Sequence, residues 1–447
     1  MKNFLISLLL LCLLFSFTDE IYSQTNAKRP AALIGNTDSL KFSDYFIAKT
    51  LRVDFVMAGN HSTEHVYLDK IRQEPLWGGP HKNLADLYNL GSYRIVLLDS
   101  ATGRTIFSRG FCNVFEEWQG TEEAKITERS FAQTAVMPFP QKTVIFRIDK
   151  RVYETGKFTR LFEVCINPKD IFIIRRNPVP VPFVKLKDSG KPENSLDIAL
   201  IAEGYTQQEM PKFLADAKRI SDYFLSLKPY ADYKDRINFY ALESPSPESG
   251  VDVPGKNIYL NTSFSSSFYT FNTDRYLTTT DTKSIYDVAA SVPYDAILLL
   301  VNSNIYGGGG FLNFYAETSV DNEESMQVAV HEFGHSFAGL ADEYVGNVNY
   351  SGFYNTAVEP WEPNITTNID FASKWKEMIS KGTPVPTPRD GKNDTIVGMF
   401  EGGGYMAKDI YSPMMDCRMK TNEAPGFCQV CQAAISRMIR FYCDEKP

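Results

Sequence analysis

Histidine is scarce in this chain, which has only five histidines among its 447 residues. Four of the five lie in two short segments, residues 61–65 and 331–335. Imidazole is the side chain that most often binds transition metals and moves protons near neutral pH. Chemistry that needs paired imidazoles is therefore confined to these two segments.

Long apolar runs are absent after the first residues. Residues 4–15 are almost entirely apolar and follow Lys2, but they are too short to span a bilayer. This arrangement, with the small residue Ser23 as a cleavage point, is typical of a secretory signal peptide. We expect residues 1–23 to be removed and the protein to be exported to the periplasm, the cell surface or the medium, without stable membrane insertion. A lipoprotein acylated at Cys12 is the alternative.

Long basic runs are absent too, and the formal net charge is −8. Lysine and arginine are scattered along an ordinary globular composition that is 43% apolar. This excludes the basic surface that nucleic-acid binding requires, so no nucleic-acid partner is expected. The length predicts two domains, and the sequence leaves the oligomeric state open.

Cysteine is also sparse, and six cysteines remain once Cys12 is removed with the signal peptide. Export makes disulfides plausible: Cys112 could pair with Cys165, and the last four could pair in any of three ways. A structural zinc site is an alternative for these last four. Reduced, buried thiols are the third possibility. The last four are Cys417, Cys428, Cys431 and Cys443.

Residues 24–180 are predicted to form a β-sandwich. Short alternating segments separated by turn residues recur at residues 66–68, 93–98, 105–108, 143–148, 161–164 and 171–174. This domain could dock glycan or substrate, or it could pack against the second half of the chain.

A proline-rich and polar stretch at residues 181–194 is predicted to be the linker. Residues 195–447 then alternate between strand and helix patterns, as an α/β domain does. Strands are predicted at 196–202, 237–242 and 296–301, a helix carries Phe213 to Phe224, and another covers 430–441. The glycines at 307–310 predict an edge strand at the rim of a cleft, where an extended peptide could add.

The segment around residues 331–335 reads as a helix that carries a metal site. His331 and His335 are one turn apart on the same face, and Glu332 lies beside them. Asp342 follows shortly afterwards and can supply a third zinc ligand, which leaves the fourth position for water. With Glu332 as the base, this is the apparatus of metal-assisted amide hydrolysis by one zinc ion.

Three further features favour that helix. Asp321 and Glu324 resemble a capping box at its start, and Gly339 is a natural stop. Apolar residues recur at helical spacing and should face a core. They are Met326, Val330, Phe333, Phe337 and Leu340.

The other histidine pair reads HxxEH across His61, Glu64 and His65, the inverted order of the same motif. Ala-Gly-Asn precedes it and alternating segments flank it, so a hairpin turn is predicted. A turn does not hold two histidines one helical step apart, and no metal site is expected there.

A methionine-containing turn lies near the end of the chain. Met414 and Met415 could form an apolar floor beneath the zinc-binding imidazoles, or they could be ordinary core residues.

Five stretches resemble the IgA-peptidase-like family of zinc endopeptidases, which are related to metzincins. These are residues 202–206, 249–254, 331–344, 401–405 and 417–431. The first half is similar to the β-rich domain that usually precedes this peptidase domain. The resemblance implies a metzincin-like fold and a secreted metallopeptidase acting on proteins or peptides, with zinc on His331 and His335 and Glu332 as base.

This chain departs from the metzincin pattern by one extra residue before Gly339 and by Asp342 in place of a histidine. Glu343 is therefore the rival third ligand. Tyr344, Tyr405 and Tyr411 are candidates for stabilising the oxyanion. Two other functions stay open: a catalytically silent module that binds glycan or protein, and a zinc hydrolase of non-peptide amides.

Overall fold

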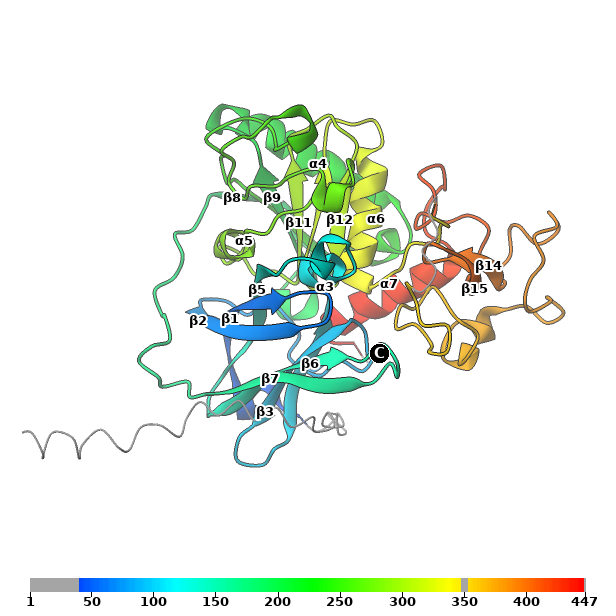
Figure 1. Ribbon diagram of the computed structural model, residues 1–447. Helices are drawn as coiled ribbons and strands as arrows, with labels where there is room; N and C mark the ends of the chain where they lie inside the picture. Colours follow the sequence, from blue (N-terminus) through cyan, green and yellow to red (C-terminus); the bar gives the residue numbers. More distant parts are fainter. Residues whose placement is uncertain (1–39, 347–352, 446–447) are drawn as a thin grey trace, which may run out of the picture.

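The computed structural model describes residues 40–346 and 353–445 (Figure 1). The predicted signal peptide, residues 1–23, and Cys12 lie outside these ranges. Within the described ranges, none of the helices has the length and apolar character needed to cross a membrane.

Two antiparallel sheets make up the N-terminal part. One has the order β2-β1-β5 and the other β4-β3-β6-β7. Residues from both sheets, such as Phe55, Leu97 and Phe146, are buried in one shared core. The short helix α2 (Phe42–Tyr45) precedes β1, and α3 (Val114–Gln119) lies between β4 and β5. The strands are β1 (Phe46–Gly59), β2 (Glu64–Glu74), β3 (Tyr93–Asp99), β4 (Thr105–Phe111), β5 (Arg129–Pro140), β6 (Val144–Arg151) and β7 (Phe158–Ile166).

The strand predicted at residues 171–174 is wrong. Ile171 and Phe172 are 85% and 83% exposed, and only Ile174 forms an isolated bridge, to Arg72. The guanidinium of Arg175 donates to the carbonyls of Pro168, Asp170 and Ile173, which holds this segment in turns. An apolar run becomes a strand only where a neighbouring strand is free to pair with it.

The predicted turn at residues 61–65 is confirmed. Gly59 of β1 pairs with Glu64 of β2, and the side chain of Asn60 accepts from the backbone N–H groups of Ser62 and Thr63. Both histidines of this pair therefore sit on a hairpin.

A six-stranded sheet of order β12-β13-β11-β9-β10-β8 forms the centre of the molecule. Its four inner strands are parallel, and the two edge strands run antiparallel to their neighbours. Edge strand β8 lies inside the stretch predicted to be a linker, because its alternating Val-Lys-Leu-Lys sequence pairs with β10. The strands are β8 (Phe183–Lys187), β9 (Leu196–Glu203), β10 (Ile237–Leu242), β11 (Ala296–Val301), β12 (Gly308–Phe311) and β13 (Tyr315–Ser319).

The two faces of this sheet are covered differently. Ile198 and Leu200 of β9 face a core shared with α4 (Met210–Ser226), α6 (Ser325–Ala338) and α7 (Gln429–Tyr442). The alternate residues Ala199 and Ile201 face a core shared with α5 (Thr282–Ala289) and the N-terminal sheets. The protein is thus of mixed α+β type, and the N-terminal sheets cover one face of the central sheet.

A buried arginine joins these two parts. Arg52 of β1 has no exposed surface, and its guanidinium lies 2.8 Å from Asp54, 3.2 Å from Glu74 and 2.6 Å from Asp287 of α5. It also donates to the carbonyl of Lys283 at 3.1 Å. The N-terminal sheets are therefore attached to α5 by a charge network centred on a buried arginine, with Asp287 at its exposed edge.

The region between α6 and α7 contains little regular structure. Its one hairpin in the described residues pairs β14 (Phe400–Gly403) with β15 (Met406–Ser412), drawn in orange in Figure 1. Thr366 bonds to Tyr411 of β15, and Val345, just after α6, bridges to Tyr405. These contacts place the hairpin beside the C-terminal end of α6.

Candidate active site

Helix α6 carries the histidine pair. Val330, Phe333 and Phe337 are at most 1% exposed, so these residues of the predicted apolar stripe face the core, whereas Met326 at its start is half-buried. Gly339 ends the helix in the left-handed conformation with φ of +62°, as predicted. The predicted capping box is wrong: Glu324 makes no side-chain capping bond, and its N–H bonds to the side chain of Asn322 at 3.0 Å.

Strand β12 can lie directly against α6 because three of its four residues are glycines. A Cβ at Gly308 would be 2.8 Å from Cγ of Glu332, and one at Gly310 would collide with the Glu332 carbonyl oxygen. The outer edge of β12 is partly occupied, since Leu277 N–H donates to the Gly308 carbonyl at 3.2 Å. The edge strand predicted here is present, but the segment that contains Leu277 already pairs with its first residue.

Three side chains converge at the C-terminal end of α6. Nε2 of His331 lies 3.1 Å from Nε2 of His335, and Oδ1 of Asp342 lies 3.0 Å and 3.5 Å from these two nitrogens. Nitrogen or oxygen ligands about 2.0 to 2.1 Å from one tetrahedral zinc ion are about 3.3 Å apart. The three atoms therefore fit one tetrahedral zinc ion without rearrangement.

The other ring nitrogen of each histidine is already engaged. Nδ1 of His331 lies 2.9 Å from the carbonyl oxygen of Arg418, and Nδ1 of His335 lies 2.6 Å from that of Leu340. A carbonyl oxygen can only accept, so each Nδ1 carries a proton, which leaves each Nε2 to bind either a second proton or a metal ion. This is the tautomer that a metal ligand needs.

The site has a strongly negative field centred on Asp342. Burial alone would raise the pKa of Asp342, but the charge of His335 and the hydrogen bonds from both histidines outweigh burial and lower that pKa far below its usual range. Burial alone would lower the pKa of His335, whereas the charge of Asp342 raises it to about 9. The carboxylate thus attracts positive charge to the point between the imidazoles, which favours a divalent cation there.

Glu332 is the remaining carboxylate of the site. Burial raises the pKa of its side chain, and the charges of His331 and His335 oppose that rise. A carboxylate with a raised pKa is a better proton acceptor near neutral pH. The position and basicity of Glu332 suit proton transfer next to the three converging atoms.

The three candidate tyrosines occupy different positions. The hydroxyl of Tyr405 donates to Oδ2 of Asp342 and so orients that carboxylate. Tyr344 packs edge-on against Tyr405 with ring centroids 5.2 Å apart, and burial followed by the charge of Asp342 raises its pKa. Tyr411 lies on β15 opposite Glu401.

The methionine beneath the metal helix is one that the sequence did not single out. The sulfur of Met419, a residue with no exposed surface, would lie 2.9 Å from a Cβ at Gly334, between the two histidines. Met415 instead accepts from the guanidinium of Arg389, and Met414 is half-buried at the edge of the core. The methionine that packs against α6 at the histidine pair therefore lies four residues after Met415 and five after Met414.

Further residues of the site come from distant segments and carry no sequence signal. Glu117 of α3 accepts a hydrogen bond from Tyr276, and its carboxylate interacts electrostatically with His335 and Glu332. Burial would lower the pKa of Arg275, but its interactions with Tyr344 and Asp342 are among those that outweigh burial and raise it. An N-terminal helix and a loop of the second half thus contribute to the surroundings of the metal-binding atoms.

The two candidates for the third zinc ligand, Asp342 and Glu343, lie in different surroundings. Asp342 meets the histidines, whereas Glu343, which has no exposed surface, meets Asn364 at 2.9 Å and the sulfur of Cys431 at 3.0 Å. Each carboxylate therefore belongs to its own cluster of candidate ligands.

Of the three alternatives for the cysteines, the disulfides are not formed, because all six cysteines of the described residues are free. Cys165 is exposed on β7 and Cys112 packs at the core that contains α6. Cys443 lies near the carbonyl of Arg236, apart from the other three C-terminal cysteines, which meet Glu343.

The fold and site define a mixed α+β protein with a candidate metal centre of the HExxH type. Residues 184–395 and 389–439 match the family described as IgA Peptidase M64, and residues 41–163 match the family described as Peptidase M64 N-terminus. These matches span more than half of the chain, so the protein belongs to the IgA peptidase M64 family and is a peptidase. A search of curated proteins found no match.

Proposed function

We propose that this protein is an exported, zinc-dependent endopeptidase that cleaves peptide bonds in proteins or peptides. The observation that carries the proposal is the convergence of His331 Nε2, His335 Nε2 and Asp342 Oδ1 within 3.5 Å of one another, beside Glu332. The apolar N-terminal segment, residues 1–23, supports export.

His331, His335 and Asp342 would hold one catalytic zinc ion. Zinc in such a site acts as a Lewis acid toward water and a peptide carbonyl. Glu332 accepts the proton of the attacking water and then delivers it to the leaving amine, so it acts first as base and then as acid. Tyr344 is the proposed oxyanion donor, because it packs against Tyr405, whose own hydroxyl already donates to Asp342.

The proposal concerns the reaction and not the identity of the substrate. Substrate choice depends on the side chains around the site, and Glu117 and Arg275, which interact electrostatically with the metal-binding residues, are candidates for such contacts. The family description names IgA, and that substrate is not transferred to this chain.

The test is metal content and cleavage measured on the same purified protein. We expect cleavage of an unstructured protein substrate that stops with a chelator and returns with added zinc. Glu332→Gln should reduce the rate at least about 100-fold while zinc content stays unchanged, since only the base is lost. Full activity of Glu332→Gln would overturn the base assignment, and chelator-resistant cleavage would overturn zinc dependence.

A further inference from the structure

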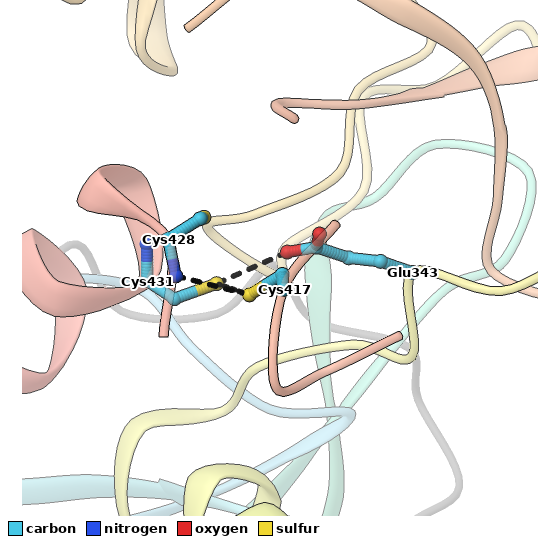
Figure 2. Close-up of side chains that lie close together, drawn as sticks. All are labelled: Glu343, Cys417, Cys428 and Cys431. Atoms are coloured by element: carbon cyan, nitrogen blue, oxygen red, sulfur yellow. Dashed lines mark hydrogen bonds between the residues drawn. The ribbon is translucent and has the colours of Figure 1, made fainter. Parts of the chain in front are cut away.

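A second cluster of candidate metal ligands lies apart from the histidines. Cys428 and Cys431 come from the start of α7, Cys417 from the preceding loop, and Glu343 approaches from the opposite side (Figure 2). These four side chains are 6% exposed or less. Their ligand atoms all lie within 4.8 Å of one another.

The spacing of the sulfur atoms distinguishes a metal site from a disulfide. The sulfurs of Cys417 and Cys431 are 3.8 Å apart. A disulfide would hold them about 2.05 Å apart. Two thiolates on one tetrahedral zinc ion, each about 2.3 Å from the metal, are about 3.8 Å apart. The observed separation excludes a disulfide and equals the spacing that zinc thiolates require, so a zinc ion could bind without moving these sulfurs.

The carboxylate of Glu343 needs a cation. Its Oε1 accepts from Asn364 and from Cys431, but its Oε2 is buried without a hydrogen-bond partner among the described residues. The positive charge that acts on Glu343 is that of Lys420, whose ammonium is also without a hydrogen-bond partner among the described residues. A buried carboxylate without full compensation is costly, and a divalent ion would compensate it.

Backbone N–H groups are already directed at the sulfur atoms. The N–H of Cys428 donates to the sulfur of Cys417 at 3.2 Å, and the N–H of Cys431 donates to the sulfur of Cys428 at 3.5 Å. Both groups belong to the N-terminal turn of α7, where the helix dipole favours negative charge. Such bonds stabilise thiolates, the form of cysteine that binds zinc.

We propose that Cys417, Cys428, Cys431 and Glu343 form a second, structural zinc site. Three thiolates and one carboxylate suit the borderline-soft zinc ion, and four protein ligands leave no open position for water or substrate. With Lys420 beside it, the site would carry a net charge of about −1, from four anionic ligands, one divalent ion and one ammonium.

This site would position the catalytic residues. Glu343 is the chain neighbour of Asp342, and Cys417 is the neighbour of Arg418, whose carbonyl holds His331. Glu343 N–H also donates to the carbonyl of Met419 at 2.7 Å. One ion bound to Glu343 and Cys417 would therefore fix the loop that carries Asp342 relative to the turn that orients His331.

The main test counts zinc per chain in purified full-length protein by mass spectrometry of the metals. We expect two zinc ions in the wild type and one in Cys431→Ser. Cys443→Ser is the matched control, since it alters another buried cysteine of the same region outside the cluster, and it should keep two. Equal zinc content in the wild type and Cys431→Ser would overturn the proposal.

A second test does not depend on folding of a cysteine variant. His335→Ala should lose the catalytic ion and retain one zinc, whose X-ray absorption should show sulfur neighbours at about 2.3 Å. A retained zinc with only nitrogen and oxygen neighbours would contradict the second site. This readout is independent of cleavage, so it also stands if the proposed peptidase mechanism fails.

Alkylation under denaturing conditions separates the zinc site from a disulfide. Wild-type protein unfolded with chelator and without reductant should label at all three cluster cysteines. Without denaturant or chelator, the same cysteines should stay unlabelled. Two peptides of this cluster that stay linked, with a mass two hydrogens lower than the sum of the two unlabelled peptides, would show a disulfide and overturn the proposal.

Discussion

Asp342 and Glu343 are neighbours in the chain, yet their carboxylates belong to different clusters. The sequence correctly places an acidic pair after Gly339, but it cannot divide the pair between two sites. That division depends on Asn364, which bonds to both backbone groups of Ala341 and to Glu343, and on cysteines far along the chain. Contacts between distant segments leave no periodic pattern in a sequence.

Separate substitution of the two acids should therefore remove different ions. Asp342→Asn should abolish cleavage and remove the zinc bound by the histidines, because an amide is a weak zinc ligand. Glu343→Gln should remove the zinc bound to sulfur instead. Metal counting combined with X-ray absorption distinguishes the two. Loss of the same ion in both variants would contradict the assignment.

Glu317 of β13 predicts a pH effect on stability. Burial raises the pKa of this carboxyl from 4.5 to about 8, although the hydroxyl of Ser266 donates to it at 2.8 Å. The folded protein thus keeps a proton that the unfolded chain loses above about pH 4.5. The retained proton therefore makes the free energy of unfolding depend on pH. This free energy is highest below about pH 4.5 and should fall by up to roughly 5 kcal/mol as pH rises to about 8.

Glu317→Gln should remove that pH dependence, since the amide is neutral throughout. The measurement is the free energy of unfolding in denaturant at several pH values with zinc present in excess. We expect the variant to lose less stability than the wild type between about pH 5 and pH 8. Parallel curves for the two proteins would show that Glu317 is not the group responsible.

At the scale of elements, hydrophobic patterning predicts much of the central fold. Strands β10 and β11 have the predicted limits, and α7 extends one residue beyond its prediction at each end. These elements lie in the core, where burial alone decides which face points inward. Patterning fails at residues 171–174 and at the start of α6, where single side chains, Arg175 and Asn322, decide the local structure.

The glycine strand β12 gives a test of close packing at this scale. Gly310→Ala would push a methyl group into the backbone of α6 at Glu332. We expect a loss of stability of about 1 to 3 kcal/mol, as for other overpacked sites, together with reduced cleavage. The measurements are the denaturant midpoint and the rate of peptide cleavage.

Gly120→Ala is the matched control for this change. Gly120 is exposed, its φ of −76° suits alanine, and a Cβ there would make one slightly tight contact, 3.3 Å from the carbonyl oxygen of Glu117. Its stability should change by less than about 1 kcal/mol. If both variants behave alike, close approach of β12 is not what requires glycine.

At the scale of the whole molecule, the N-terminal sheets complete the core of the peptidase half. They cover the face of the central sheet opposite α4, α6 and α7, and α3 brings Glu117 toward the metal-binding residues. The sequence predicts both halves of the chain but not how they pack together. An apolar face has the same sequence pattern whether it packs within its own half or against the other half.

Arg52 tests how firmly the two parts are joined. Arg52→Leu would leave Asp54 and Glu74 buried without their main positive partner, and we expect a loss of about 3 to 5 kcal/mol in the free energy of unfolding. Lys218→Gln removes an ion pair with Asp222 in which both side chains are 59% exposed, and it should cost less than about 1 kcal/mol. Similar losses in both variants would contradict a structural role for the buried network.

The hydrogen bond from His331 to the carbonyl of Arg418 joins residues 87 positions apart. Protein synthesis proceeds from the N-terminus, so the complete HExxH motif leaves the ribosome well before Arg418 and α7 exist. A chain that ends before Arg418 therefore contains His331, His335 and Asp342 but lacks the carbonyl that orients the His331 ring. The geometry of the metal-binding residues is completed only when the last tenth of the chain has been made.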